Sequence, residues 1–379
     1  MKKFFLSITL IAITGVPVFA CTSWMVFSDF TKNATNILHK NRDSKTRDIA
    51  VYLSPEGAKR KWIAIGTNST NAGVNASGLA GVMNSGEKTK DAPNAKDKKS
   101  TPALLRVILD NCDTAAQAVK KLEEMIKAGD YYHNDSGSTF FFMDTKEGYI
   151  CEFTTRHFTV QRHTEKYAVR ANIWQNPGMP SRSCGTFKGY LHSSARAYVA
   201  ISGLNQALDK GGKITVQDVI NLSRNCELPD KLSYPNRPVC GMTTNSGCTL
   251  EIDIQYPDVL SSGYVTLGHP RNTICLPIPI CAEKILPSMS TYNWSHAAFD
   301  RAERMFSWDM LWNKQAGFTA PIPETWLKFE AASMAKYADA KAKARLLLNS
   351  GKRAEAIKLL NDAAYTIWSD AEALLNLKK

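Results

Sequence analysis

Within residues 21–290, short strand-like stretches are interrupted twice by segments whose apolar residues recur every three or four positions. Stretch 21–27 is apolar and rich in β-forming residues, residues 29–33 are turn-like, and 36–43 returns as a second strand, which predicts a hairpin. The predicted helices are 102–111, 114–128, 193–208 and 216–224. The order strands, helices, strands, helices, strands favours an α+β fold, with sheets covered by helices, over a parallel βαβ array.

Four further strands follow one another closely in the middle of the chain, and this succession predicts a meander. They are 138–144, 149–154, 158–162 and 167–171. After residue 290 the chain becomes rich in Trp, Ala, Lys and Glu, and 331–348 and 353–377 predict an amphipathic helical hairpin around Gly351. We therefore expect a core domain at 21–290 and a C-terminal helical extension at 291–379, whose aromatic residues would serve packing or a homo-oligomer surface.

The first 20 residues have the pattern of a signal peptide. Lys2 and Lys3 precede an apolar stretch at 4–16 that is short for a membrane span, and Val18 and Ala20 are small residues before a cleavage point. We therefore expect residues 1–20 to be removed and the protein to be exported, either periplasmic or secreted. No later apolar run has the length of a membrane span.

Composition excludes several classes of protein. With 44% hydrophobic and 22% charged residues, the chain is typical of a globular protein and unlike a disordered segment or a coiled coil. The formal net charge is +12, but the basic residues are scattered rather than gathered on a helix face with aromatics, so no nucleic-acid partner is expected. The positive charge fits solubility or an anionic substrate.

Nine cysteines are many for a protein that stays inside the cell and fit an oxidising compartment. Cys21 directly follows the predicted cleavage point, and the other eight could form four disulfides. The chain has no Cys-x-x-Cys pair and no His-Glu-x-x-His motif, so we expect no metal site.

Removal of residues 1–20 would leave a thiol and a free α-amine on the same residue, Cys21. The thiolate is a nucleophile, and an α-amine titrates near neutral pH, so it can accept the thiol proton. One residue would then supply both nucleophile and base. Asp43, on the paired strand of the hairpin, is a suitable carboxylate to orient the resulting ammonium.

Stretch 21–23 (Cys-Thr-Ser), followed by 40–43 (Lys-Asn-Arg-Asp), resembles the opening of the N-terminal-nucleophile (Ntn) linear-amide hydrolases. That family includes bile-salt hydrolases, penicillin V acylases and acyl-coenzyme A:6-aminopenicillanate acyltransferases, and the resemblance continues in order over about 21–283. It implies an Ntn-hydrolase four-layer αββα sandwich in which two antiparallel sheets lie between helical layers. It also implies that no metal or organic cofactor is needed.

The same resemblance implies roles for further residues. Asn84 ends a Gly-x-Asn-x-x-Gly-Leu turn region and corresponds to an oxyanion-hole Asn. Asn172 corresponds to a second oxyanion or substrate donor at a strand end, a position for which Asn176 also competes. Arg196 lies in a Ser-x-x-Arg helix start and would support the site.

Lys40 and Arg42 are expected to bind substrate. Lys40 stands where bile-salt hydrolases carry Arg, and a lysine cannot reproduce a bidentate arginine contact. The motif 40–43 is closer to the acyltransferase-like branch of the family.

The expected activity is hydrolysis of a linear amide through an acyl-enzyme thioester on Cys21, with a small-molecule substrate. An N-acyl amino acid, a bile salt, a penicillin-like compound or a small peptide would fit. An acyltransferase or a dipeptidase on the same fold is an alternative. A second alternative is a non-catalytic, lipid-anchored surface binding protein, because a cysteine after a leader can be acylated and would then lose both thiol and amine.

Overall fold

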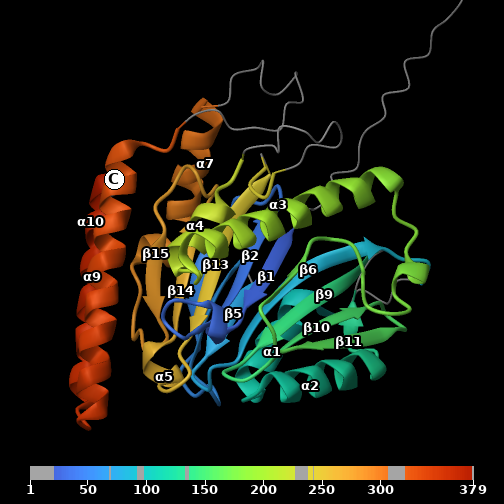
Figure 1. Cartoon of the computed structure of the whole chain (residues 1–379), viewed down its shortest axis with the longest axis horizontal. Helices are drawn as coiled ribbons and strands as arrows, with labels where there is room; N and C mark the ends of the chain where they lie inside the picture. The colour runs from blue at the N-terminus through green and yellow to red at the C-terminus, as the bar shows by residue number, and fades with distance from the viewer. Residues whose placement is uncertain are drawn as a thin grey trace, which may run out of the picture.

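The computed structural model describes residues 21–67, 70–91, 98–132, 136–226, 238–241, 243–305 and 321–377. The predicted signal peptide, residues 1–20, lies outside the described residues. Figure 1 shows the two large sheets in the middle of the molecule and the C-terminal helices along one edge.

The first large sheet contains the predicted N-terminal hairpin. Its strands, in sheet order, are β12 (Tyr167–Arg170), β1 (Thr22–Val26), β2 (Asn36–Asp43), β13 (Thr244–Ile252), β14 (Ser262–Leu267) and β15 (Leu276–Pro279). All neighbours in it are antiparallel. We call it the six-stranded sheet.

The second large sheet, the seven-stranded sheet, is also antiparallel throughout. Its order is β11 (Phe158–His163), β10 (Gly148–Phe153), β9 (Ser136–Met143), β6 (Ala80–Lys88), β5 (Ala72–Asn75), β4 (Trp62–Gly66) and β3 (Ala50–Leu53). Two short parallel strands, β7 (Lys99–Ser100) and β8 (Tyr131–Tyr132), form a separate pair.

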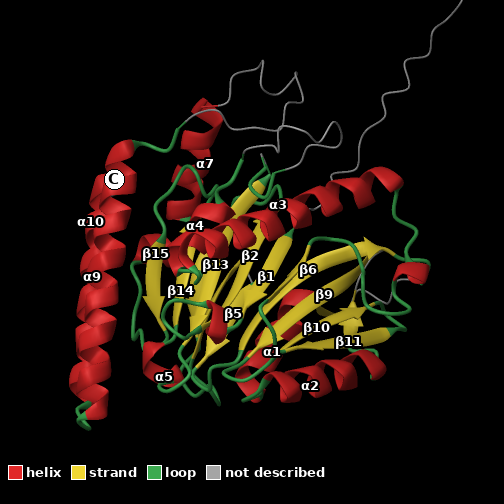
Figure 2. Cartoon of the chain, viewed as in Figure 1, coloured by secondary structure: helices red, strands yellow, loops and turns green. Residues whose placement is uncertain are grey.

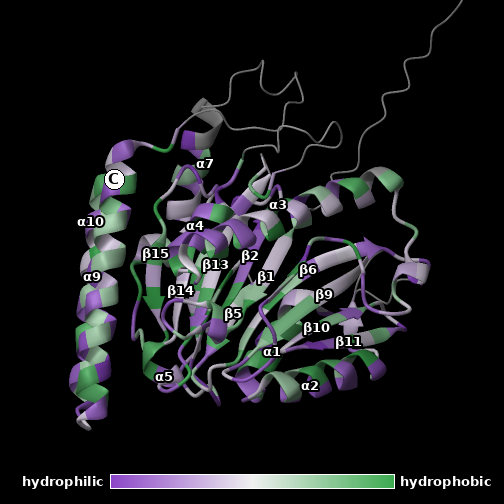
Figure 3. Cartoon of the chain, viewed as in Figure 1, coloured by the Kyte–Doolittle hydropathy of each residue, from purple (hydrophilic) through white to green (hydrophobic). Residues whose placement is uncertain are grey.

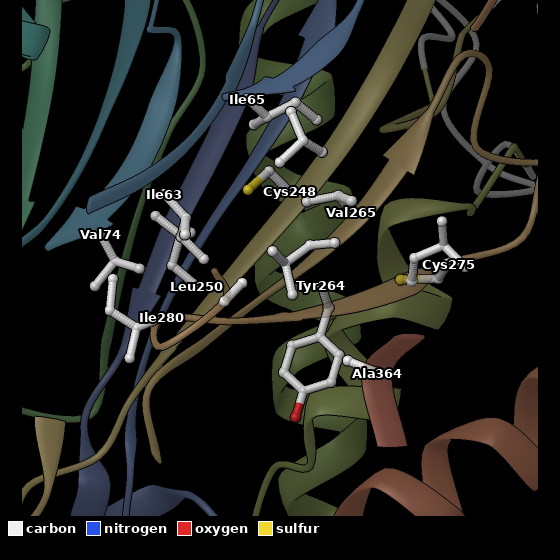
Figure 4. Packing of buried hydrophobic residues seen from close by; sticks show 14 of the residues in the cluster. Ile63, Ile65, Val74, Cys248, Leu250, Tyr264, Val265, Cys275, Ile280 and Ala364 are labelled. Carbon is white, nitrogen blue, oxygen red and sulfur yellow. The ribbon is translucent and has the colours of Figure 1, made fainter. Parts of the chain in front are cut away.

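The two sheets pack face to face through alternating apolar side chains. Ile63 and Ile65 of β4 lie opposite Cys248 and Leu250 of β13, and all four are buried (Figure 4). Residues two apart on a strand point to the same face, so each strand contributes every second side chain to this core.

Helices cover the outer face of each sheet (Figure 2). Helices α1 (Thr101–Asn111) and α2 (Ala115–Lys127) pack on the seven-stranded sheet, while α3 (Phe187–Gly211) and α4 (Val216–Ser223) pack on the six-stranded sheet. Each layer has its own apolar cluster between helix and sheet. The predicted four-layer αββα sandwich is therefore confirmed.

The short helix α5 (Pro257–Leu260) connects β13 to β14, and the described helices after β15 are α6 (Pro287–Ser290), α7 (Asn293–Met305), α9 (Glu324–Asn349) and α10 (Arg353–Leu374). Helices α9 and α10 form a hairpin whose turn contains Gly351 at φ +77°. Their surface alternates between hydrophobic and hydrophilic residues along each helix (Figure 3). The apolar side packs on β15, where the Trp368 indole donates to the Pro277 carbonyl at 2.8 Å, so the hairpin shares the core of the sandwich.

The predicted meander is wrong at its last strand. β9, β10 and β11 pair in order, but β12 crosses to the other sheet and pairs with β1, with Ser23 opposite Arg170. Alternation within a strand shows which face is buried but not which strand it pairs with. The crossing gives β1 a partner on its outer side and brings residues 171–176 to the start of β1.

The expected disulfides are not present. All nine cysteines lie among the described residues, and the structure joins none of them in a disulfide; Cys226 and Cys240 are buried against each other. Most of them, including Cys151 and Cys248, are each buried in an apolar cluster. A thiol packs in such surroundings as a small apolar group. None of the helices in the described part of the chain combines the length and apolarity of a membrane span.

Candidate active site

Cys21 lies at the amino end of β1, between β2 and β12. Ser23 pairs with Lys40 across the β1–β2 ladder, and continuing this antiparallel register by two residues places Cys21 level with Arg42. Because side chains alternate between the faces of a sheet, these four residues share one face. Ser23 and Lys40 both reach Asn84 of β6, so this face is the one turned to the seven-stranded sheet.

Asn172 meets Cys21 from the opposite side. The backbone nitrogen of Cys21 donates to Oδ1 of Asn172 at 2.7 Å, and Nη2 of Arg196 donates to the same oxygen at 2.7 Å. Nδ2 of Asn172 donates to the Ser85 carbonyl at 2.7 Å. Asn172 therefore holds the nitrogen of Cys21 in this structure, and its expected role as a second oxyanion or substrate donor stays a prediction.

Arg196 lies on α3 with its side chain buried, and it supports this arrangement. Besides Asn172, its guanidinium donates to Oγ1 of Thr22 at 3.2 Å and to Oγ of Ser193 at 3.3 Å. The helix begins at Phe187, so Arg196 lies well inside it rather than at its start. A buried guanidinium bonded to both Asn172 and β1 fixes the distance between them.

Asn84 is fully buried on β6, and its two amide ends differ. Oδ1 accepts from Oγ of Ser23 and from Nζ of Lys40, both at 2.9 Å. Nδ2 is buried and has no hydrogen-bond partner among the described residues. A buried N–H without a partner is costly, and at a reaction centre it is suited to an oxygen that develops negative charge.

Lys40 is buried and connects Asn84 to Cys21. Its side-chain nitrogen donates to Oδ1 of Asn84 at 2.9 Å and lies close enough to Cys21 to interact with the thiol. Burial lowers the pKa of Lys40 and Arg42 adds to the lowering, whereas Cys21 and Asp43 oppose it. Burial thus disfavours the charged form of Lys40, and the neighbouring thiol and carboxylate favour it.

Arg42 and Asp43 complete the charges around the thiol. Burial lowers the pKa of Arg42, while Cys21 and Asp43 oppose that shift. Nη1 of Arg42 is buried without a partner in the described structure. Asp43 ends β2, and its Oδ1 accepts from Oγ1 of Thr244 at 2.5 Å. Its predicted role in orienting the amine remains a prediction.

Two carboxylates that the sequence analysis did not single out anchor the loop that carries Asn172. Glu152 is fully buried and accepts from the backbone nitrogens of Gln175 at 2.9 Å and Asn176 at 2.8 Å. Glu87 accepts from the backbone nitrogen of Trp174 at 3.3 Å. Glu152 is the one charged residue in an otherwise apolar strand, and this position is the signal that could have identified it.

The two asparagines of this loop make different contacts. Asn176 is buried and its Nδ2 donates to the Ile150 carbonyl at 2.9 Å, so it ties the loop to β10. Asn172 is the one that contacts Cys21. In the described part of the chain, no group of three or more His, Cys, Asp or Glu residues could hold a metal ion.

Comparison with known proteins identifies one family. A sequence model of the family described as acyl-coenzyme A:6-aminopenicillanic acid acyl-transferase matches residues 29–232, more than half of the chain. The match begins after Cys21, so it does not include the candidate nucleophile. No curated protein sequence matches the chain significantly.

Two solved structures are similar at low sequence identity. A variant of the conjugated bile acid hydrolase from Clostridium perfringens is 11% identical, with a TM-score of 0.47 over 68% of this chain and 92% of that one. Penicillin V acylase from Agrobacterium tumefaciens is 15% identical, with a TM-score of 0.46 over 68% of this chain and 86% of that one.

Proposed function

Because the chain belongs to the acyl-coenzyme A:6-aminopenicillanic acid acyl-transferase family, we propose that it breaks a linear amide carbon–nitrogen bond with Cys21 as the N-terminal nucleophile. One observation carries this assignment. The nitrogen of Cys21 is held by Asn172, while its thiol contacts Lys40, which in turn holds Asn84. Both reactive groups of Cys21 thus have a polar partner, and the partner of the thiol also holds the Asn84 amide.

Activation requires that residues 1–20 be removed, because only then is the nitrogen of Cys21 an amine. An unprotonated α-amine accepts the thiol proton, directly or through one water. Oδ1 of Asn172 accepts from the resulting ammonium and holds it near the sulfur. Under this proposal the protein is exported, and the precursor has no activity.

The reaction then proceeds in two acyl-transfer steps. The sulfur of Cys21 attacks the carbonyl carbon, and the carbonyl oxygen becomes an oxyanion that accepts from Nδ2 of Asn84. The carbon–nitrogen bond breaks, and the leaving amine takes the proton from the α-ammonium. Water attacks the thioester while the α-amine takes its proton, and the acid is released with Cys21 restored.

Acyl transfer is the second candidate, because the matching family is itself described as an acyltransferase. An acceptor amine would then replace water in the second step. Lys40 and Arg42 place two cations beside the nucleophile, and this charge favours a substrate that carries a carboxylate. N-acyl amino acids, conjugated bile salts, penicillin-like amides and small peptides all fit this description.

Two measurements test the assignment. N-terminal sequencing and intact mass of the exported protein should show an unmodified Cys21, whereas a diacylglyceryl adduct would instead identify a lipid-anchored protein.

p-Nitrophenyl acetate, an activated ester, should acetylate Cys21 and release a burst of p-nitrophenolate. Cys21→Ala and Cys21→Ser should remove this burst, while Cys184→Ser, which changes an exposed thiol, should keep it. A burst that survives in Cys21→Ala would refute the nucleophile.

Turnover is then sought in a panel of N-acyl amino acids, penicillin V, conjugated bile salts and dipeptides. Loss of amide product in Cys21→Ser, with an unchanged unfolding midpoint, would link the same thiol to the amide reaction. Release of product in the presence of an added amine, with the amine incorporated, would identify the acyltransferase.

A further inference from the structure

The orientation of the Asn84 amide decides whether it can serve the proposed reaction. A side-chain amide has an acceptor end, Oδ1, and a donor end, Nδ2, of nearly equal size. Only the donor end can stabilise an oxyanion. With the amide rotated by half a turn, Oδ1 would face the developing negative charge and oppose it.

Lys40 distinguishes between these two orientations. An ammonium has three donors and no acceptor, so only Oδ1 can satisfy it. With the amide rotated, Nδ2 would face Nζ, and a buried cation would lose a hydrogen bond. The hydroxyl of Ser23 can donate or accept, so it strengthens the observed orientation without selecting it.

The sheet register explains why both contacts reach Asn84. Ser23 and Lys40 are directly opposite each other on β1 and β2, and both side chains point between the sheets. Asn84 comes from β6 of the seven-stranded sheet, where it is fully buried. The three residues therefore join the two sheets beside Cys21, where the proposed reaction places the substrate carbonyl.

We propose that Lys40, assisted by Ser23, is a positioning residue that holds Asn84 with Nδ2 turned to the carbonyl oxygen attacked by Cys21. The inference rests on the function proposed above and adds the origin of its oxyanion donor. The single donor group of Lys40 would then serve both the Asn84 amide oxygen and the Cys21 thiol.

A double-mutant cycle on acetylation by p-nitrophenyl acetate tests this role. Asn84→Ala should slow acetylation of Cys21 by about 100-fold to 1,000-fold, the effect of removing one oxyanion donor. Lys40→Met removes every donor and should slow it at least about tenfold. If Lys40 acts through Asn84, adding Lys40→Met to Asn84→Ala should change the rate by less than about twofold, since coupled residues are not additive.

Further variants separate positioning from a purely structural effect. Lys40→Arg keeps a donor-only side chain and should retain the rate within about fivefold, whereas Lys120→Met, at an exposed site on α2, should leave it unchanged. Ser23→Ala should cause a smaller loss, and it provides the same cycle with Asn84→Ala if Lys40→Met does not fold. On an amide substrate, Lys40→Met should lower kcat with little change in KM.

The outcomes separate the inference from the function on which it rests. If Lys40→Met slows acetylation equally with and without the Asn84 side chain, the inference is overturned, because Lys40 would then act on the thiol alone. Full activity of Lys40→Met in a protein whose burst depends on Cys21 would also overturn it, while leaving the proposed function intact. A burst independent of Cys21 would remove the function itself.

Discussion

The backbone nitrogen of Cys21 donates to Oδ1 of Asn172 over 2.7 Å, although 151 positions separate the two residues in the sequence. The contact exists because β12 crosses from one sheet to the other and pairs with β1. It places the carbonyl of an asparagine where an N-terminal amine would need an acceptor. Several testable consequences depend on this geometry.

Asn172→Ala should lower the rate of Cys21 acetylation by about 100-fold, because a small displacement of a catalytic group has effects of that size. It also removes one acceptor of the buried Arg196 guanidinium, which should cost about 1–3 kcal/mol of unfolding free energy. The matched control is Asn176→Ala in the same loop. It removes a hydrogen bond to Ile150 and should destabilise the protein by about 1 kcal/mol, with less than about a tenfold change in rate. The opposite ranking of the two variants would contradict the assignment.

Buried histidines predict a loss of stability in acid. Burial lowers the pKa of His39 and of His269 to about 3 and that of His163 to about 4, from an ordinary value of 6.5. Below pH 6.5 these histidines therefore bind protons in the unfolded chain while they stay neutral in the folded protein. The stabilisation is complete above pH 6.5 and decreases as the pH falls toward 4. The decrease should be at most about 1.4 kcal/mol per pH unit for each of the fully buried His39 and His269, and smaller for the half-buried His163.

Urea unfolding between pH 7 and pH 4 measures this dependence. His269→Gln can retain a hydrogen bond to the Gly241 carbonyl. It should reduce the slope of the unfolding free energy against pH by the contribution of one protonating group. A slope equal in His269→Gln and the unmodified protein would show that this ring does not resist protonation.

The ion pair between Arg224 and Glu330 should make the C-terminal hairpin necessary for stability. Both side chains are buried, their oxygens and nitrogens lie 2.6–2.8 Å apart, and Glu330 also accepts from the Cys275 nitrogen at 2.7 Å. Glu330→Ala leaves a buried guanidinium unpaired and should cost about 3–5 kcal/mol in urea unfolding. Glu324→Ala breaks an exposed pair on the same helix and should cost less than about 1 kcal/mol. Similar costs for the two would argue against the hairpin as part of the core.

The thiols should differ sharply in accessibility. Cys184 is exposed, whereas Cys21 and the other seven are buried. A thiol reagent such as iodoacetamide should label Cys184 first in the folded protein, and Cys184→Ser should remove this fast phase. After denaturation without a reductant, all nine cysteines should be alkylated. Fewer labelled thiols would show that disulfides form despite the separation of most cysteines in the fold.

Local structure was largely predictable from the sequence. Strand 36–43 was predicted with the bounds that β2 has, and Thr114 caps α2 by accepting from the Gln117 nitrogen at 3.2 Å. Strand alternation, helical spacing and capping are properties of neighbouring residues, so they can be seen in the sequence. The layered α+β organisation follows from the order of these elements.

Long-range partners were not predictable in the same way. Ser23 and Ser85 are unremarkable in the sequence, and their importance comes from contacts with residues 61 and 87 positions away. The choice between Asn172 and Asn176 also depends on register, because the two differ by four residues in one loop. The role of each polar group depends on which of its atoms is engaged, and this is a property of the assembled fold.

The crossing of β12 between the sheets has a consequence for maturation under the proposed function. Residues 167–196 supply both the acceptor for the Cys21 nitrogen and the guanidinium that holds this acceptor. A chain exported in N-to-C order would therefore present Cys21 long before these partners. Leader removal alone would then leave an inert cysteine, and its reactivity would begin only when the sandwich has closed.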